Sequence, residues 1–253
     1  MFHDVHSRVK SIRLAVRADD FGLHRACDAV MLGLVRAGVL QNVSVQANGP
    51  DLTQSAGELA ASGACVGLHL CFTCEWRNVA VSSVSERERV PNLMRHGRLP
   101  ATATQLEHVD VGELLVEADA QLERLQAFGL RPAYADTHMG VHHTHAGLNQ
   151  RIRGWARDAG LRWIDDTPRL RHLRHPTGKP SWAGLATGTY LLVLHPGDAT
   201  ANLVLDADPT RAIGRQRADE ATLLRNVVTA ARSDERVQLC RLDDPVADFC
   251  THV

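Results

Sequence analysis

The sequence predicts a parallel α/β fold, and within that class an irregular (β/α) barrel of the TIM type, formed by residues 1–253 as a single domain. Strand-like and helical segments alternate about six or seven times, which is typical of parallel sheets with crossover helices. The 253 residues, 44% of them hydrophobic, can bury a large core. A doubly wound open sheet is the alternative. The first strand lacks a G-x-G-x-x-G turn and no G-x-x-x-x-G-K-S/T occurs, which excludes its usual nucleotide-binding versions.

The first third of the chain supplies three strands and two helices. Apolar residues predict strands at 12–18, 42–48 and 64–70. Helical spacing of apolar residues predicts helices at 26–38 and 51–63. Gly38 is expected to end the first helix, and Asp51 is a good N-cap for the second because its side chain can accept a bond from a free backbone N–H.

Residues 72–109 interrupt this alternation. The segment is polar and basic, and it is too long for an ordinary connection between a strand and a helix. We expect it to be either a functional lid or insertion, or a locally disordered loop.

The alternation resumes in the second half of the chain. The clearest amphipathic helix is expected at 111–129, and further helices at 148–160 and 208–233. Strands are expected at 132–140, 161–165, 189–197 and 236–242. The first of these runs into a turn, and a Pro-Gly pair ends the third.

Composition excludes several classes of function. The net charge is −1 and aromatic residues make up 4%, which argues against a nucleic-acid partner. No apolar run approaches the ~20 residues that span a bilayer, and the N-terminal residues lack the apolar core of a secretory signal. We therefore expect a cytoplasmic protein with no membrane partner. A homo-oligomer stays open.

The six cysteines are scattered, and we interpret them mostly as small core residues. Cys71 and Cys74 form a C-x-x-C, but a structural zinc site would need a second such pair, which the chain lacks. Packing is therefore favoured over a metal or redox role for this motif.

Acidic and imidazole side chains follow four of the predicted strands, each at its carboxyl end. They are Asp19 and Asp20, His69, Asp136 and His138, and His195. In a barrel these ends meet on one face, where such folds carry out chemistry. Two adjacent buried carboxylates are costly unless a cation pairs with them. One carboxylate and two imidazoles suit a divalent metal that keeps positions open for water and substrate.

Each of these residues also has a purely structural interpretation. A histidine at a strand end is commonly just a hydrogen-bonded polar residue, and the two aspartates could cap the next helix. His138 and His142 have the i, i+4 spacing of a helical metal pair, although Gly140 between them disfavours a helix. The agreement of four separate strand ends favours a site.

Four motifs occur in the order ADDFG, VGLHL, DTHMGVH and LHPG. With them the chain resembles the YdjC-like carbohydrate deacetylases from about residue 12 to about residue 242. The resemblance implies a distorted (β/α) barrel and one divalent metal ion, zinc or magnesium. It also implies a small-molecule substrate, an N-acetyl amino sugar of the N-acetylglucosamine type in a mono- or oligosaccharide or glycoconjugate, from which acetate is released.

The resemblance further implies roles for individual residues. Asp20, His69 and His138 would hold the metal, Asp19 would be the general base, and His195 the general acid. Beside these, we expect Asp136 to orient a histidine, and Trp76 and Arg77 to contact sugar.

The chain departs from the family pattern at three positions. His24 and Asp28 stand where the family often has Ser and Asn, and Gly140 stands where it has a histidine. The chitooligosaccharide substrate of some members is therefore not carried over. Two other classes stay open, namely a metal-dependent barrel hydrolase acting on a phosphoester or cyclic amide, and a non-catalytic sugar-binding descendant. A phosphate site would want several basic strand ends, whereas these are mostly acidic and imidazole.

Overall fold

The computed structural model describes residues 12–165, 169–176, 180–201 and 212–244. Its strands are β1 (Ile12–Phe21), β2 (Asn42–Val45), β3 (Cys65–Leu70), β4 (Tyr134–Thr137), β5 (Arg162–Trp163), β6 (Leu170–His172), β7 (Gly188–Leu194) and β8 (Val237–Leu239). Its α-helices are α1 (Arg25–Arg36), α2 (Leu52–Ala61), α3 (Val111–Ala127), α4 (Val141–Thr144), α5 (Ala146–Asp158) and α7 (Ile213–Arg232). Two 3-10 helices are η1 (Ala103–Leu106) and η2 (His138–Gly140).

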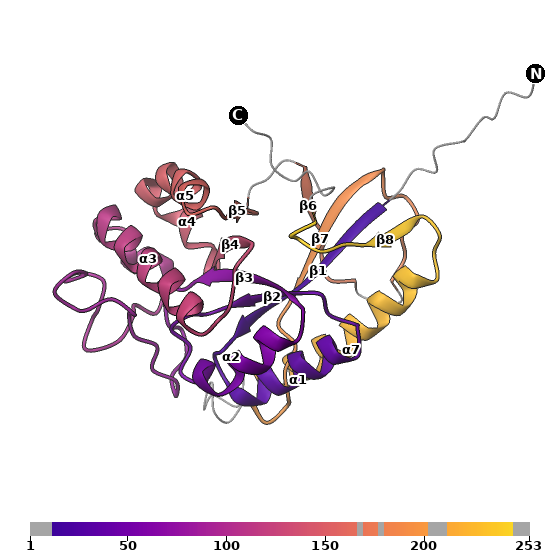
Figure 1. Cartoon of the computed structure of the whole chain (residues 1–253), viewed down its shortest axis with the longest axis horizontal. Coiled ribbons are helices and arrows are strands. Elements are labelled where there is room, and N and C mark those ends of the chain that lie inside the picture. The colour runs from indigo at the N-terminus through magenta and orange to yellow at the C-terminus, as the bar shows by residue number, and fades with distance from the viewer. Residues whose placement is uncertain (1–11, 166–168, 177–179, 202–211, 245–253) are drawn as a thin grey trace, which may run out of the picture.

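The strands form one parallel sheet in the order β5-β4-β3-β2-β1-β7-β6, and β8 pairs with β1. The sheet curls, and helices α1, α2, α3 and α7 lie along its outer side (Figure 1). Among the described residues no pairing joins β5 to β6, so the curl stays open there. The predicted parallel α/β fold and irregular barrel are confirmed as this incomplete barrel.

Most predicted elements are present with shifted ends. Strand β2 ends at Val45 rather than at residue 48, and β6 was not predicted. Helix α7 begins at Ile213; residues 208–211 of the predicted helix lie outside the described residues. Gly38 follows α1 with a φ of +66°, a conformation that glycine adopts without strain.

Asp51 precedes α2 as predicted, but it does not cap that helix with its side chain. Its carboxylate accepts instead a hydrogen bond of 2.8 Å from the backbone N–H of Arg25, at the start of α1. The side chain therefore stabilises the neighbouring helix terminus, which needs an acceptor for the same reason.

The inside of the curl is apolar at the amino ends of the strands. Ala15, Cys65, Tyr134 and Leu191 are buried in one cluster there. Tyr134 fills the space beside β3, where a Cβ on Gly67 would lie 2.0 Å from its ring, so only glycine fits. Because side chains alternate along a strand, the same inward face continues toward the carboxyl ends, where polar residues replace apolar ones.

The side chain of Asn42, on β2, connects β1 with the residues that follow β8. Strand β8 pairs with the first half of β1, and β2 with the second half. The buried Asn42 amide donates to the carbonyls of Val16 and Cys240, at 3.0 and 3.3 Å, and accepts from the N–H of Leu242 at 2.7 Å. The side chain thus satisfies backbone groups where the ladder changes partner.

Residues 72–109 pack against α3. The buried carboxylate of Glu117 accepts hydrogen bonds from the N–H groups of Val84 and Ser85, at 2.8 and 2.9 Å. Several apolar side chains of the segment, among them Val81, Val90 and Leu93, join the main core. Whether the segment acts as a lid stays a prediction.

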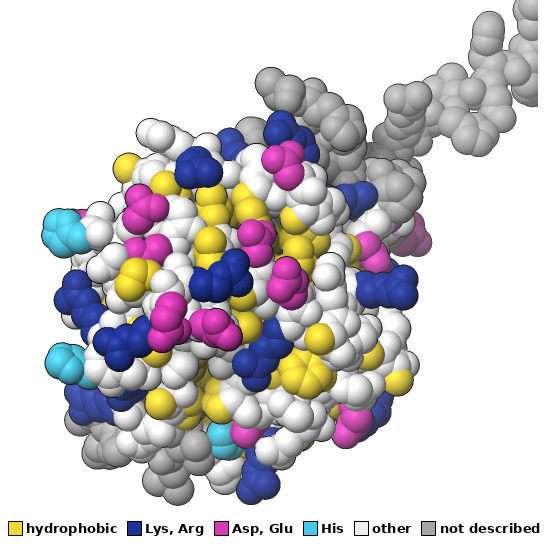
Figure 2. Space-filling view, turned by 60° about the vertical axis from the view of Figure 1, so that its left-hand side comes forward, with side chains coloured by type: hydrophobic (Ala, Val, Ile, Leu, Met, Phe, Trp, Pro, Cys, Tyr) yellow, Lys and Arg dark blue, Asp and Glu magenta, His cyan; other side chains and the backbone are white. Residues whose placement is uncertain are grey.

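The outer surface carries mixed charges. Figure 2 shows acidic and basic side chains interspersed over the face it displays, in keeping with the net charge of −1. Among the described residues no helix has the length and apolar character needed to cross a membrane. The five described cysteines are buried and free, and burial raises the pKa of Cys71 to about 12, which keeps it a thiol.

Asp28 anchors α1 to the turn after β1. Its buried carboxylate accepts from the N–H of Gly22 at 2.8 Å and from the hydroxyl of Ser55 at 2.6 Å. Burial raises the pKa of Asp28 to about 7. The folded state therefore holds the proton of this group more tightly than the unfolded chain does, so its contribution to stability is lost as pH rises from about 4 to about 7.

We expect Asp28→Asn to stabilise the protein above neutral pH. An amide keeps the bond from Gly22 and can donate to the Ser55 hydroxyl, but it cannot ionise. The gain in unfolding free energy should grow from pH 5 to pH 8 and reach on the order of 2–4 kcal/mol. Urea unfolding at both pH values measures it. Asp158→Asn, at an exposed carboxylate, is the control, and a gain independent of pH would contradict the prediction.

Candidate functional site

A bulge at the end of β1 places two neighbouring carboxylates on the same side. Side chains of successive strand residues normally point to opposite faces. Here the pairing of β1 with β2 shifts register between Ala18 and Phe21, and Asp20 has a left-handed φ of +67°. Asp19 and Asp20 consequently line one cavity. Both are buried, with 3% and 1% of their surfaces exposed.

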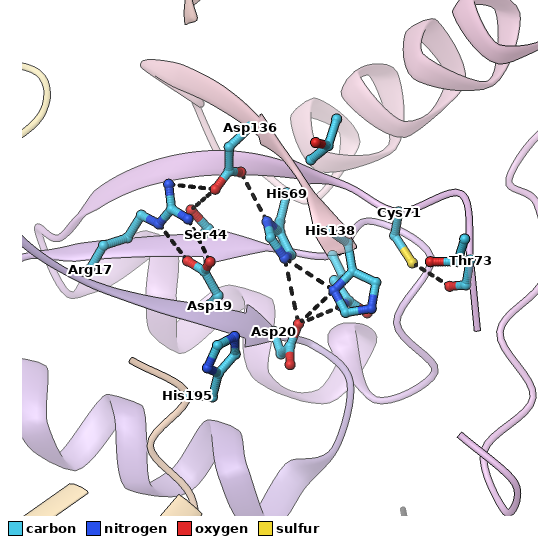
Figure 3. Close-up of polar contacts among 12 residues, drawn as sticks. Arg17, Asp19, Asp20, Ser44, His69, Cys71, Thr73, Asp136, His138 and His195 are labelled. Atoms are coloured by element: carbon cyan, nitrogen blue, oxygen red, sulfur yellow. Dashed lines mark hydrogen bonds and ion pairs between the residues drawn. The ribbon is translucent and has the colours of Figure 1, made fainter. Parts of the chain in front are cut away.

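Asp20, His69 and His138 form a compact group of ligand-type atoms at this end of the barrel. The Asp20 Oδ1 atom lies 3.6 Å from His69 Nε2 and 3.2 Å from His138 Nδ1, and these two nitrogens are 3.3 Å apart. One ligand atom from each residue falls within 4.8 Å of the others (Figure 3). The structure thus brings together the three residues predicted to hold a metal.

The far nitrogen of each imidazole meets a carboxylate. His69 Nδ1 lies 3.0 Å from Asp136 Oδ1, and His138 Nε2 lies 3.0 and 3.1 Å from the two oxygens of Glu75. Metal-binding histidines are commonly held in this way, because the carboxylate fixes the ring and the position of its proton. Asp136 lies against His69, and its role in orienting that histidine stays a prediction.

Arg17 crosses the site beneath this group. Its guanidinium binds both oxygens of Asp19 at 2.6 Å and reaches Asp136 Oδ2 at 2.6 Å (Figure 3). Asp19, His69 and Asp136 are also close enough to form a second metal-type group. Arg17 pairs with both of its carboxylates, and its single positive charge offsets one of their two negative charges.

The charges of the site fit a divalent cation. The carboxylates that meet there are Asp19, Asp20, Glu75 and Asp136, and the guanidiniums are Arg17 and Arg217. Once a cation replaces the ring protons of His69 and His138, and with Glu220 offset by a protonated His195, these groups leave two negative charges. Burial would raise the pKa of Asp20, but His138 and Arg217 outweigh it and hold that pKa well below its ordinary value. Asp20 is therefore ionised and available as a ligand.

Helix α7 completes the site from the other side of the barrel. The Arg217 guanidinium binds Asp20 Oδ2 at 2.6 Å and lies over the Trp76 ring, 5.4 Å from its centre. Glu220 accepts from the backbone N–H of His195 and lies 3.6 Å from its Nδ1. Burial lowers the pKa of His195, but the bond to Glu220 and the charges of the two aspartates raise it further than burial lowers it. The protonated form of the His195 ring is therefore favoured.

These side chains surround a cavity of about 370 Å³, which is lined by Asp19, Asp20, His69, His138 and His195 together with residues of α7. Its wall includes Glu75, Trp76, Met139 and Ile213. Trp76 is 7% exposed, and Arg217 covers its ring. Arg77 is exposed and lies outside the residues that line the cavity. Their contacts with sugar stay predictions.

His142 does not share the site of His138. Met139 and Gly140 both have left-handed φ values, +56° and +58°, and break the helix between the two histidines. The His142 Nδ1 atom lies 2.5 Å from the Thr137 hydroxyl instead. His138 and His142 therefore do not form a helical i, i+4 metal pair, an arrangement that Gly140 already disfavoured.

Several site residues were not identified from the sequence. Arg17 could have been found, because a charged residue inside an apolar strand, two positions before Asp19, must point to the same face. Glu75, Arg217 and Glu220 gave no local signal that distinguishes them from surface charges.

A protein family and several known proteins resemble this chain in sequence. The profile of a protein family described as "YdjC-like protein" matches residues 13–186. A "Carbohydrate deacetylase" of Geobacillus stearothermophilus is 33% identical over 137 residues, which are 53% of this chain and 51% of that protein. A "Chitooligosaccharide deacetylase" of Escherichia fergusonii is 28% identical over 137 residues, 52% of this chain and 50% of that one. The chain spans about half the length of the curated relatives it matches.

The fold also occurs in a crystal structure from Enterococcus faecalis V583, of a protein proposed to cleave cellobiose phosphate. The TM-score is 0.74 at 19% identity, and the match covers 91% of this chain and 97% of that one. At this identity the likeness concerns the fold alone. It does confirm that the incomplete parallel barrel is an established architecture.

We expect Arg17→Gln to destabilise the protein by about 3–5 kcal/mol, because it leaves two buried carboxylates without their shared counter-charge. The unfolding free energy from urea titration checks this value.

Arg36→Gln is the matched control, since Arg36 forms an exposed ion pair with Glu58 that should contribute less than about 1 kcal/mol. Equal losses in the two variants would show that the buried ion pairs of Arg17 contribute no more than a surface pair.

Proposed function

Because the chain belongs to the YdjC-like protein family, we propose that it is a metal-dependent deacetylase that hydrolyses the N-acetyl group of an amino sugar. The observation that carries the proposal is the meeting of Asp20, His69 and His138 in one cavity, with Asp19 and His195 lining the same space. This set offers a cation site, a base and an acid within one cavity.

The names of the relatives support the proposed substrate class. Two curated proteins similar to about half of this chain are named as deacetylases of carbohydrate and of chitooligosaccharide. A chitooligosaccharide carries N-acetyl groups on its amino sugars. A cavity of about 370 Å³ is near the lower end of the range for small-molecule sites, which suits one or two sugar rings.

Asp19 is suited to act as the general base. A divalent ion held by Asp20, His69 and His138 would lower the pKa of a water molecule and polarise the acetyl carbonyl. Asp19 accepts the proton of the attacking water, while Arg17 holds both of its oxygens and fixes its direction. Asp20 would hold the metal through Oδ1 while its Oδ2 binds Arg217, so Asp19 is the carboxylate left for this role.

His195 is suited to act as the general acid. When the carbon–nitrogen bond breaks, the sugar nitrogen must receive a proton to leave as an amine. Glu220 lies by Nδ1 and favours the protonated ring, which leaves Nε2 to donate. With 38% of its side chain exposed, His195 is accessible to a substrate in the cavity. The products are acetate and the free amino sugar.

Acetate release from a panel of N-acetylated amino sugars tests the proposal. N-acetylglucosamine and chitooligosaccharides of increasing length would be incubated with protein loaded with zinc or magnesium, and with protein treated with a chelator. We expect acetate and free amine in equal amounts, only with metal. Metal-loaded protein that releases no acetate from the panel but cleaves a phosphoester or a cyclic amide would overturn it.

Asp19→Asn should retain the metal and lose about 10²–10⁴-fold in kcat, because an amide cannot accept the proton of water. Acetate release and metal content of the same preparation measure the two effects. Asp158→Asn, at an exposed carboxylate, serves as the control. Near wild-type turnover by a folded Asp19→Asn protein would remove Asp19 from the mechanism.

His195→Ala should affect amide and activated ester substrates differently. Loss of the acid should slow N-deacetylation by about 10²–10⁴-fold. An aryl acetate leaves as a stable phenolate and needs no acid, so its hydrolysis should fall far less, with metal bound in both assays.

The exposed His108→Ala provides the control for the histidine substitution. Equal losses on amide and ester would indicate that His195 maintains the shape of the site and donates no proton.

A further inference from the structure

Glu75 is a carboxylate of the cavity that the proposed deacetylation does not use. It follows the Cys71–Cys74 motif in the loop after β3, its side chain is 15% exposed, and both of its oxygens face His138 Nε2 at 3.0 and 3.1 Å. The opposite nitrogen, Nδ1, is the one that faces Asp20 and His69, at 3.2 and 3.3 Å.

From this geometry we propose that Glu75 is a positioning residue that selects Nδ1 of His138 as its metal-binding nitrogen. The inference rests on the metal centre of the proposed function, but not on its substrate or reaction. An ionised carboxylate only accepts hydrogen bonds, so the proton of a neutral His138 ring stays on Nε2. The lone pair on Nδ1 is then directed at Asp20.

His69 has the opposite arrangement. Asp136 lies at its Nδ1, 3.0 Å away, so its Nε2 faces the group. The two imidazoles would therefore bind a metal through different nitrogens, Nε2 of His69 and Nδ1 of His138. Two acidic residues on separate segments, Asp136 on β4 and Glu75 in the loop after β3, decide this difference.

The loop that carries Glu75 is held by many short contacts. The side-chain amide of Gln121 on α3 binds the backbone of Cys71. It accepts from the Cys71 N–H at 3.0 Å and donates to the Cys71 carbonyl at 2.8 Å. The Cys71 thiol donates to the carbonyl of Thr73 at 3.1 Å (Figure 3), and the Cys74 thiol to that of Val79 at 3.1 Å. The C-x-x-C motif thus fixes the backbone just before Glu75.

Glu75 also supplies part of the charge that a divalent ion needs. It contributes one of the four carboxylates in the site, against two guanidiniums. Removing it leaves a single net negative charge and frees the His138 ring to rotate or change tautomer. Both effects weaken binding of a cation.

Zinc affinity and the nitrogen that binds zinc are the two measurements. Competition with a chelator should show Glu75→Ala binding zinc about 10–100-fold more weakly than the wild type. Glu75→Gln should lose less, because an amide oxygen can still accept the Nε2 proton. The exposed Glu58→Ala is the matched control and should bind as the wild type does.

Nitrogen-15 NMR of the zinc-loaded wild-type protein should assign the bound atoms as Nδ1 of His138 and Nε2 of His69. This measurement needs no variant, so it stands even if Glu75→Ala fails to fold. Zinc bound through Nε2 of His138, or a folded Glu75→Ala with wild-type affinity, would overturn the proposal. Zinc bound as described without acetate release would defeat the deacetylase function and support this inference. A wild-type protein that binds no zinc would overturn the inference about Glu75.

Discussion

The pairing of Arg17 with Asp19 and Asp136 is the interaction on which the site depends. All three side chains lie inside the barrel, where an unpaired charge would cost several kcal/mol. One guanidinium binds both the carboxylate that faces the cavity and the carboxylate that holds His69. It therefore fixes the direction of the proposed base and, through Asp136, the ring of a metal-type histidine.

The other charged side chains of the site are paired with residues that lie outside the sheet. Helix α7 places Arg217 against Asp20 and Glu220 against His195. The loop after β3 places Glu75 against His138. These contacts surround the cavity, and the family profile, which ends at residue 186, includes neither α7 nor His195. The part of the chain beyond that profile thus supplies one side of the site.

The sequence predicted the fold and the main part of the site because both follow from local patterns. Alternating apolar strands and amphipathic helices indicated a parallel sheet, and the carboxyl ends of parallel strands lie at one edge. Asp20, His69 and His138 could be placed together on that basis, and the structure brings them within 4.8 Å. The order of four short motifs added the family.

The sequence by itself thus determined most of the strands, the edge at which they end, and the acidic and imidazole residues that stand there. Only the tertiary structure decided which side chains meet. Alternation alone would direct Asp19 and Asp20 to opposite faces, and the left-handed turn at Asp20 brings them to one. Asp20 and Arg217 are 197 positions apart. Their contact depends on how α7 packs against the barrel, and the pattern of apolar residues within a helix does not specify which distant carboxylate it will meet.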